Sequence, residues 1–160
     1  DEVVPPEVRE RWRARLASGA TWTEHEGLAL LADYGIPTAR SEVAGNSDEA
    51  VAIAERLGWP VVVKTAADVA HKSDQGGVIV GVEDIDALEA AYADLASRLG
   101  PQVLVQEMAP VGVELAMGIV RDPQFGPLVM VAAGGVWVEI LEDRAFALPP
   151  LDTEIGRAHV

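Results

Sequence analysis

The stretch that decides the fold is WPVVVKTAADVAHKSDQGGVIVGV, residues 59–82. It begins with three consecutive valines, residues 61–63, which are typical of a buried strand and are followed by Lys64. A polar loop, residues 67–77, closes on two glycines, and a second apolar segment, residues 78–82, leads the chain back. Two apolar segments joined by such a loop predict a β-hairpin with an enlarged tip.

Lysine is restricted to this hairpin. Of the twelve Lys and Arg residues in the chain, two are lysines, and both Lys64 and Lys72 lie here. A lysine ammonium is a compact point charge of the kind that binds phosphate, and adjacent glycines let backbone amides approach an anion closely. The hairpin is therefore predicted to bind phosphate groups. The residues that this interpretation places there are Lys64, His71, Lys72, Ser73, Gly76 and Gly77.

The loop residues leave a second interpretation open, in which the hairpin tip is solvated and its two lysines are incidental. The P-loop pattern G-x-x-x-x-G-K-[ST] does not occur in the chain, and neither does the dinucleotide-binding pattern G-x-G-x-x-G. Neither of these two nucleotide-binding folds is therefore supported. The choice between a phosphate site and a solvated tip depends on the rest of the chain.

Composition limits the classes of protein to which the chain can belong. At 160 residues it has the length of about one domain. Its formal net charge of −14 argues against nucleic acid or an anionic membrane as the main partner. It has no cysteine, so neither disulfide bonds nor thiolate chemistry is available. No apolar run approaches the ~20 residues that span a membrane and no signal peptide is visible, so we expect a cytoplasmic protein.

The first hundred residues alternate predicted helices and strands. Residues 7–17 are predicted to form a charged helix with arginines at alternate positions, either a solvated linker or a basic docking face. Thr23 followed by Glu26 forms the capping box of a second helix, in which His25 is expected to be exposed. Further helices are predicted at residues 48–57 and 83–99, with strands at 38–43, 61–63, 78–82 and 103–108. This alternation predicts a mixed sheet covered by helices.

After residue 108 the pattern changes to strands without helices. Strands are predicted at residues 113–120, 128–133 and 136–141, with a turn at 121–127. We therefore divide the chain into a linker helix at 1–20, a first lobe with the phosphate hairpin at 21–107, and the start of a second lobe at 108–160. A new helical pattern begins at Asp152 and the sequence stops at Val160, so the second lobe is expected to be incomplete.

Five segments of the chain match one known family in order and spacing. They are PVVVK at 60–64, HKSDQGGV at 71–78, VQEMAPVGVE at 105–114, RDPQFGP at 121–127 and GGVWVEILED at 134–143. Over residues 23–151 the chain resembles the ATP-grasp domain of NDP-forming acyl-CoA synthetases, the group of the ADP-forming acetate–CoA ligases, and in particular its beta-subunit-like part. The resemblance implies an α/β (α+β) fold, with two small lobes of mixed or antiparallel sheet and packed helices.

The resemblance also implies a nucleotide site for ATP or ADP with Mg²⁺. Lys64 would neutralise the phosphates, Glu107 and the backbone of Met108 would meet the adenine edge, and Glu114 would bind the ribose hydroxyls. On the residues alone, both glutamates would be solvent-facing strand carboxylates. The family's magnesium ligands are expected beyond the last residue of this sequence, and Glu139 is a weak candidate within it.

Phosphoryl transfer is implied for the hairpin loop. His71 would accept a phosphoryl group, because neutral imidazole is a nucleophile that titrates near physiological pH. Lys72 and the amides of Gly76 and Gly77 would stabilise the transferring oxygens. The alternative that stays open is that His71 only hydrogen-bonds the nucleotide phosphates.

The activity that the resemblance implies is an acid–thiol ligase reaction: acyl-CoA + ADP + phosphate ⇌ carboxylic acid + CoA + ATP, through phosphohistidine. CoA-binding and ligase domains or a separate subunit would be the partner, the complete enzyme is expected to be oligomeric, and the chain alone is expected to be inactive. Three alternatives stay open: a nucleotide-sensing module of a larger enzyme such as a fused acetyltransferase, a ligase that forms an acyl phosphate directly, and an inactive docking fragment.

Overall fold

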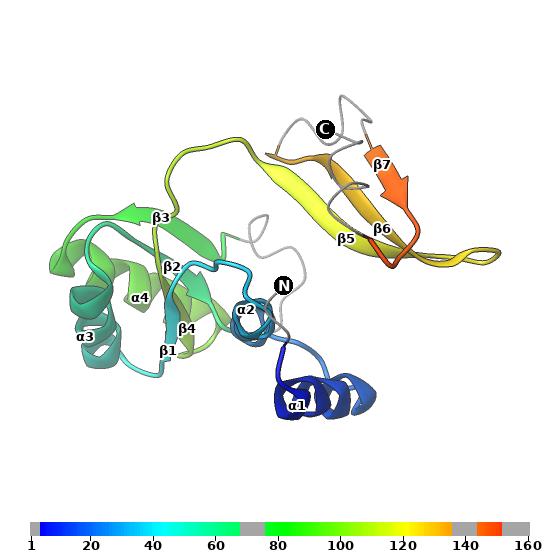
Figure 1. Cartoon of the computed structure of the whole chain (residues 1–160). Coiled ribbons are helices and arrows are strands. Elements are labelled where there is room, and N and C mark those ends of the chain that lie inside the picture. Colours follow the sequence, from blue (N-terminus) through cyan, green and yellow to red (C-terminus); the bar gives the residue numbers. More distant parts are fainter. Residues whose placement is uncertain (1–3, 68–75, 136–143, 152–160) are drawn as a thin grey trace. The chain divides into compact units, whose positions relative to one another are not determined.

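The computed structural model of the chain describes residues 4–67, 76–135 and 144–151 (Figure 1). They form two compact units, which divide between Ala109 and Pro110. The first unit contains α1 (Pro6–Ala17), α2 (Glu24–Asp33), β1 (Ser41–Ala44), α3 (Ser47–Leu57), β2 (Val61–Thr65), β3 (Val78–Val82), α4 (Ile85–Leu99) and β4 (Val103–Glu107). The second unit contains β5 (Leu115–Asp122), β6 (Gly126–Ala133) and β7 (Arg144–Ala147).

The sheet of the first unit has the strand order β1-β4-β2-β3, and each neighbouring pair is antiparallel. The prediction of a mixed sheet is therefore wrong for the described strands. The reason lies in the connections: α3 links β1 to β2 and α4 links β3 to β4, but a third strand lies between the two strands that each helix connects. The alternation of helices and strands in the sequence shows which element follows which. Whether neighbouring strands run parallel or antiparallel depends on their order in the sheet.

The core of the first unit lies between this sheet and the two helices α3 and α4, which cover one of its faces (Figure 1). Side chains of a strand alternate between faces, so every second residue of β2 and β4 points toward the helices. The buried cluster consists of Ala44, Ala50, Ile53, Ala54, Val61, Val63, Val82, Leu88, Ala91, Leu95, Val103 and Val105. The intervening residues of β2, Val62 and Lys64, belong to the opposite face of the sheet.

Both covering helices begin and end at residues suited to helix termini. The side chain of Asn46 accepts a hydrogen bond from the amide of Glu49 at the start of α3, and Asp84 caps α4 in the same way. The helices end at Gly58 and Gly100, whose φ angles of +93° and +100° favour glycine. These local signals are why the boundaries of α4 could be predicted closely.

The first helix, α1, packs against the unit. Trp12 is 8% exposed, its ring stacks on Trp22 with centroids 5.7 Å apart, and its indole N–H donates to Asp33 at 2.7 Å. Arg11 also pairs with Asp33, and the Arg15 guanidinium lies 4.8 Å from the Trp22 ring centre. The interpretation of α1 as a solvated linker is therefore corrected: one side of the helix is anchored by a buried tryptophan, which the alternate arginines concealed in the sequence.

The second unit is an antiparallel sheet in the order β5-β6-β7. The strands β5 and β6 pair along their whole length, from Leu115 opposite Ala133 to Asp122 opposite Gly126. Their connection is tighter than the predicted turn at 121–127, because the Asp122 carboxylate accepts hydrogen bonds from the amides of Gln124 and Phe125. The strand β7 was not predicted, and the strand predicted at 136–141 lies outside the described residues.

Candidate functional site

Lys64 is the central residue of the candidate site. It follows three buried valines on β2 and belongs to the sheet face that α3 and α4 leave free. Its side chain is 19% exposed, and its Nζ donates a hydrogen bond of 2.5 Å to the Glu24 carboxylate at the start of α2. The strand therefore fixes the base of the Lys64 side chain, and its ammonium lies beside one carboxylate.

The turn that supplies Glu24 is held by a network of its own. Thr23 and Glu26 form the predicted capping box, which is confirmed: each side chain bonds the backbone amide of the other residue. Arg15 of α1 donates to both oxygens of Glu26, at 2.9 and 3.0 Å. The Arg15 guanidinium and then the Thr23 amide lower the pKa of Glu26 from 4.5 to about 2.

The base of the phosphate hairpin is also fixed. The Thr65 amide donates to the Gly77 carbonyl at 2.9 Å, and Lys64 lies opposite Val78 in the β2–β3 register. Gly76 has a φ angle of +63°, and its carbonyl accepts a hydrogen bond of 3.0 Å from Arg98 of α4. His71, Lys72 and Ser73 lie outside the described residues.

The residues predicted to meet adenine lie at the end of β4. The Glu107 amide donates to the Arg40 carbonyl, and its carboxylate accepts from the Arg40 amide at 2.8 Å and from Arg40 Nε at 2.7 Å. The hydrogen bond from the Arg40 amide, followed by that from the guanidinium, lowers the pKa of Glu107. Its side chain therefore joins β4 to the segment before β1, while the next residue, Met108, is 39% exposed.

In the second unit, Glu114 lies against the two glycines that follow β6. Its carbonyl accepts a hydrogen bond of 2.7 Å from the Gly134 amide, and a Cβ at Gly134 would lie 2.7 Å from the Glu114 carbonyl carbon. A Cβ at Gly135 would overlap the Glu114 carboxylate itself. The glycine pair therefore permits a close backbone approach and places an exposed carboxylate over the turn.

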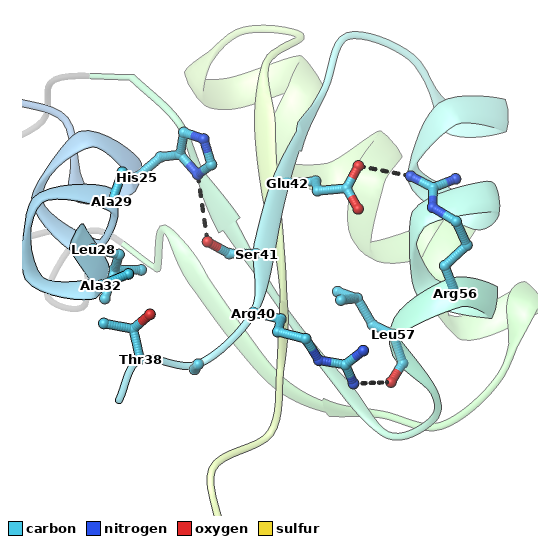
Figure 2. A pocket seen from close by; sticks show the side chains of 11 residues that line it. His25, Leu28, Ala29, Ala32, Thr38, Arg40, Ser41, Glu42, Arg56 and Leu57 are labelled. Carbon is cyan, nitrogen blue, oxygen red and sulfur yellow. Dashed lines mark hydrogen bonds and ion pairs between the residues drawn. The ribbon is translucent and has the colours of Figure 1, made fainter. Parts of the chain in front are cut away.

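Two cavities adjoin the start of α2, and His25 lines both. The larger, about 420 Å³, lies among α2, β1 and the end of α3 (Figure 2). Its polar groups bond one another: Arg56 pairs with Glu42, Arg40 donates to the Leu57 carbonyl, and His25 Nδ1 lies 3.4 Å from the Ser41 hydroxyl. The smaller, about 90 Å³, is lined by Thr23, Glu24, His25, Val43, Ala66, Gln102 and Leu104. His25 is thus half-buried, and the expectation that it is exposed is wrong.

A metal centre depends on a cluster of ligand side chains, and a membrane span depends on the length and polarity of a helix. Among residues 4–67, 76–135 and 144–151, no three His, Asp or Glu side chains gather in a way that suits a metal ion. No helix in the described part of the chain is long and apolar enough to cross a bilayer. Glu139, the weak candidate for a magnesium ligand, lies outside these ranges.

A match to a protein-family model identifies the family of the chain. The model of the ATP-grasp domain matches residues 13–159. The chain belongs to the ATP-grasp family. The predicted ATP-grasp α/β fold is confirmed, and the match extends N-terminally beyond the segments quoted above into α1.

Proteins similar in sequence to this chain include ADP-forming acetate–CoA ligases. The ADP-forming acetate–CoA ligase I of Archaeoglobus fulgidus is 45% identical over 145 residues, covering 85% of this chain and 21% of the relative. The beta subunit of the corresponding ligase I of Pyrococcus furiosus is 36% identical over 156 residues, covering 92% of this chain and 67% of the subunit. The ATP-grasp chain thus spans about a fifth of the first relative and two thirds of the second.

Solved structures agree with this relationship. The dinucleotide-forming acetyl-coenzyme A synthetase 1 of Ca. Korarchaeum cryptofilum, bound to coenzyme A and Ca-AMPCP, superposes with a TM-score of 0.84 at 36% identity, covering 94% of this chain and 70% of that one. The same enzyme bound to coenzyme A and Mg-AMPPCP, with its phosphohistidine segment pointing towards the nucleotide-binding site, has a TM-score of 0.78 at 36% identity over 95% of this chain and 68% of that one.

The sequence did not reveal three partners of the predicted residues. Glu24 pairs with Lys64 across 40 positions of sequence, and Arg40 holds Glu107 across 67. Arg98, which bonds the hairpin base, has a local signal in the sequence: Asp94 stands four residues before it and pairs with it on the same helix face.

Proposed function

We propose that this chain is the nucleotide-binding and phosphoryl-carrying part of an ADP-forming acyl-CoA synthetase. The observation on which the proposal rests is the likeness, over 95% of the chain, to an acetyl-coenzyme A synthetase that binds Mg-AMPPCP and has a phosphohistidine segment. The position of Lys64 supports it, since a partly buried ammonium on the uncovered sheet face suits phosphate. The complete enzyme would act in the cytoplasm, together with CoA-binding and ligase domains or a partner subunit.

The chemistry proposed for the chain is transfer of one phosphoryl group in two steps. A nitrogen of His71 attacks the phosphorus of a phosphohistidine on the CoA-binding part, so that one N–P bond forms as another breaks. A terminal phosphate oxygen of ADP then attacks the phosphorus on His71, which forms the P–O bond of ATP and returns the imidazole to its neutral form. Lys64 and Lys72 would balance the charge of the phosphates during transfer.

Residues toward the nucleotide are proposed on their donor chemistry. The Lys64 ammonium would pair with phosphate oxygens, and the exposed Glu114 carboxylate has two acceptor oxygens for ribose hydroxyls. Gly76, Gly77 and Ser73 would add amide and hydroxyl donors at the phosphates. Glu107 is held by Arg40, so the Met108 backbone is the freer group for the adenine edge. Magnesium, when bound with the nucleotide, would neutralise part of the phosphate charge.

Nucleotide binding is tested by calorimetric titration of Mg·ADP into the chain and into a Lys64→Met variant. We expect the variant to bind at least tenfold more weakly, because a charge-assisted hydrogen bond contributes about 1.5–3 kcal/mol. Arg144→Met, which removes a cation from β7 in the other unit, is the matched control and should bind as the parent does. Equal affinities for parent and Lys64→Met would contradict the proposed site.

The phosphoryl carrier is tested separately with Mg·ATP labelled on its terminal phosphate. We expect an acid-labile, base-stable label on His71 that is absent from a His71→Asn variant. The chain has three histidines, so His25→Asn serves as the control that keeps the label. A parent that binds nucleotide but acquires no label would contradict the carrier role and favour a nucleotide-sensing module.

A further inference from the structure

The contact between α2 and β2 has no role in the function proposed so far. The Glu24 carboxylate lies 2.5 Å from the Lys64 ammonium, and the two side chains are 33% and 19% exposed. A pair at this degree of burial is screened less by salt than a surface pair. In the described part of the chain, the Lys64 ammonium proposed to bind phosphate is therefore already paired with the Glu24 carboxylate.

Glu24 is held where it is by neighbours that do not involve Lys64. It is the first residue of α2 and directly follows Thr23, which forms the capping box with Glu26. The Arg15 guanidinium donates two hydrogen bonds to the Glu26 carboxylate. Arg15 lies on α1, and α1 is held by the stacking of Trp12 on Trp22. Because the backbone is fixed in this way, the Glu24 carboxylate can move away from Lys64 only by a change of its side-chain rotamer.

We propose that Glu24 is the resident counter-ion of Lys64, which nucleotide phosphates must displace, so that its charge lowers the affinity of the site for phosphate groups. The inference rests on the proposed function and names a positioning residue of the same site. Glu24 orients the ammonium before the ligand arrives. After phosphate replaces it, the carboxylate remains within the same helical turn and repels the bound anion, which favours release of the nucleotide after transfer.

The expected effect of removing this charge is a gain in affinity. In Glu24→Gln the amide keeps the shape of the side chain and its oxygen can still accept a hydrogen bond from Lys64, but it carries no negative charge to compete with phosphate. A partly exposed charge pair contributes an energy that corresponds to about a two- to fivefold change in affinity, so we expect Glu24→Gln to bind Mg·ADP about two- to fivefold more tightly than the parent. Mg·ATP carries one more negative charge, so its gain should be larger. Adenosine has no phosphate, and its affinity should not change.

The experiment is calorimetric titration of Mg·ADP, Mg·ATP and adenosine into the parent chain, Glu24→Gln and Glu24→Asp. The aspartate variant keeps the charge and should stay within about twofold of the parent. The matched control is Glu42→Gln, which removes a carboxylate paired with Arg56 elsewhere in the same unit and should leave the affinities unchanged. Thermal unfolding of each variant checks that all are folded.

The outcomes separate this inference from the function on which it rests. Tighter Mg·ADP and Mg·ATP binding by Glu24→Gln, with adenosine unchanged, supports the resident counter-ion. Unchanged or weaker binding by Glu24→Gln, or equal tightening by Glu24→Asp, overturns it, while a loss of binding in Lys64→Met would still support the nucleotide site. If the parent binds no nucleotide, or Lys64→Met binds as the parent does, the proposed function fails and the inference fails with it.

Discussion

Replacement of Trp12 by alanine tests whether α1 is an integral part of the first unit. Trp12 is 8% exposed, and a buried tryptophan covers about 150–250 Å², equivalent to about 4–6 kcal/mol at ~25 cal/mol per Å². This energy is an upper value, because the buried area is counted relative to a fully extended unfolded chain. Trp→Ala substitutions in protein cores cost about 3–5 kcal/mol. The remaining contacts of α1 are the exposed Arg11–Asp33 ion pair and the contacts of Arg15, which forms a part-buried ion pair with Glu26 and lies over the Trp22 ring.

Because Trp12 holds one helix, the loss should be local. We expect the amides of residues 8–17 in Trp12→Ala to exchange with deuterium about a hundredfold faster than in the parent, since ~3 kcal/mol corresponds to about that factor. The amides of β2 and β4, whose core lies under α3 and α4, should keep their protection. Hydrogen-exchange mass spectrometry resolves these segments separately.

Leu16→Ala is the matched control, because Leu16 lies on the same helix but is 59% exposed. Its exchange pattern should follow the parent. If α1 keeps its protection in Trp12→Ala, the ion pairs of Arg11 and Arg15 hold the helix and the reasoning from burial is wrong. If protection is lost across the whole first unit, α1 is part of the cooperative core rather than a locally docked element.

Three other contacts give predictions of their own. The folded-state pKa of Glu26 is about 2, below its ordinary 4.5, so the ionised carboxylate stabilises the fold fully above pH 4.5 and progressively less as the pH falls toward 2. Glu26→Gln lacks this carboxylate, so its urea midpoint should fall less steeply below about pH 5 than the parent's midpoint does. Gly134→Ala forces a Cβ against the Glu114 carbonyl and should lower the melting temperature, whereas Gly112→Ala, with no atom within 4 Å, should not. Leu88→Ala empties a fully buried site and should cost about 2–5 kcal/mol, or roughly 5–15 °C in a thermal scan.

Much of the fold and part of the candidate site could be predicted because their signals are local. The three valines before Lys64 predicted β2, and the Thr23–Glu26 spacing predicted the start of α2. The family was recognisable from five short segments in order. The strand β7 was not predicted, because only Phe146 among its four residues, RAFA, is strand-favouring, and the strand depends on pairing with β6.

The sequence by itself determined the family, the elements around the hairpin and the choice of Lys64, since periodicity, helix caps and motif order are properties of neighbouring residues. Only the tertiary structure decided what Lys64 touches. The sheet order β1-β4-β2-β3 and the docking of α2 place Glu24 beside it across 40 residues of sequence, and they place Arg40 on Glu107 across 67. Such pairs depend on strand register and helix docking, and a shift of one residue would send Lys64 to the other face of the sheet.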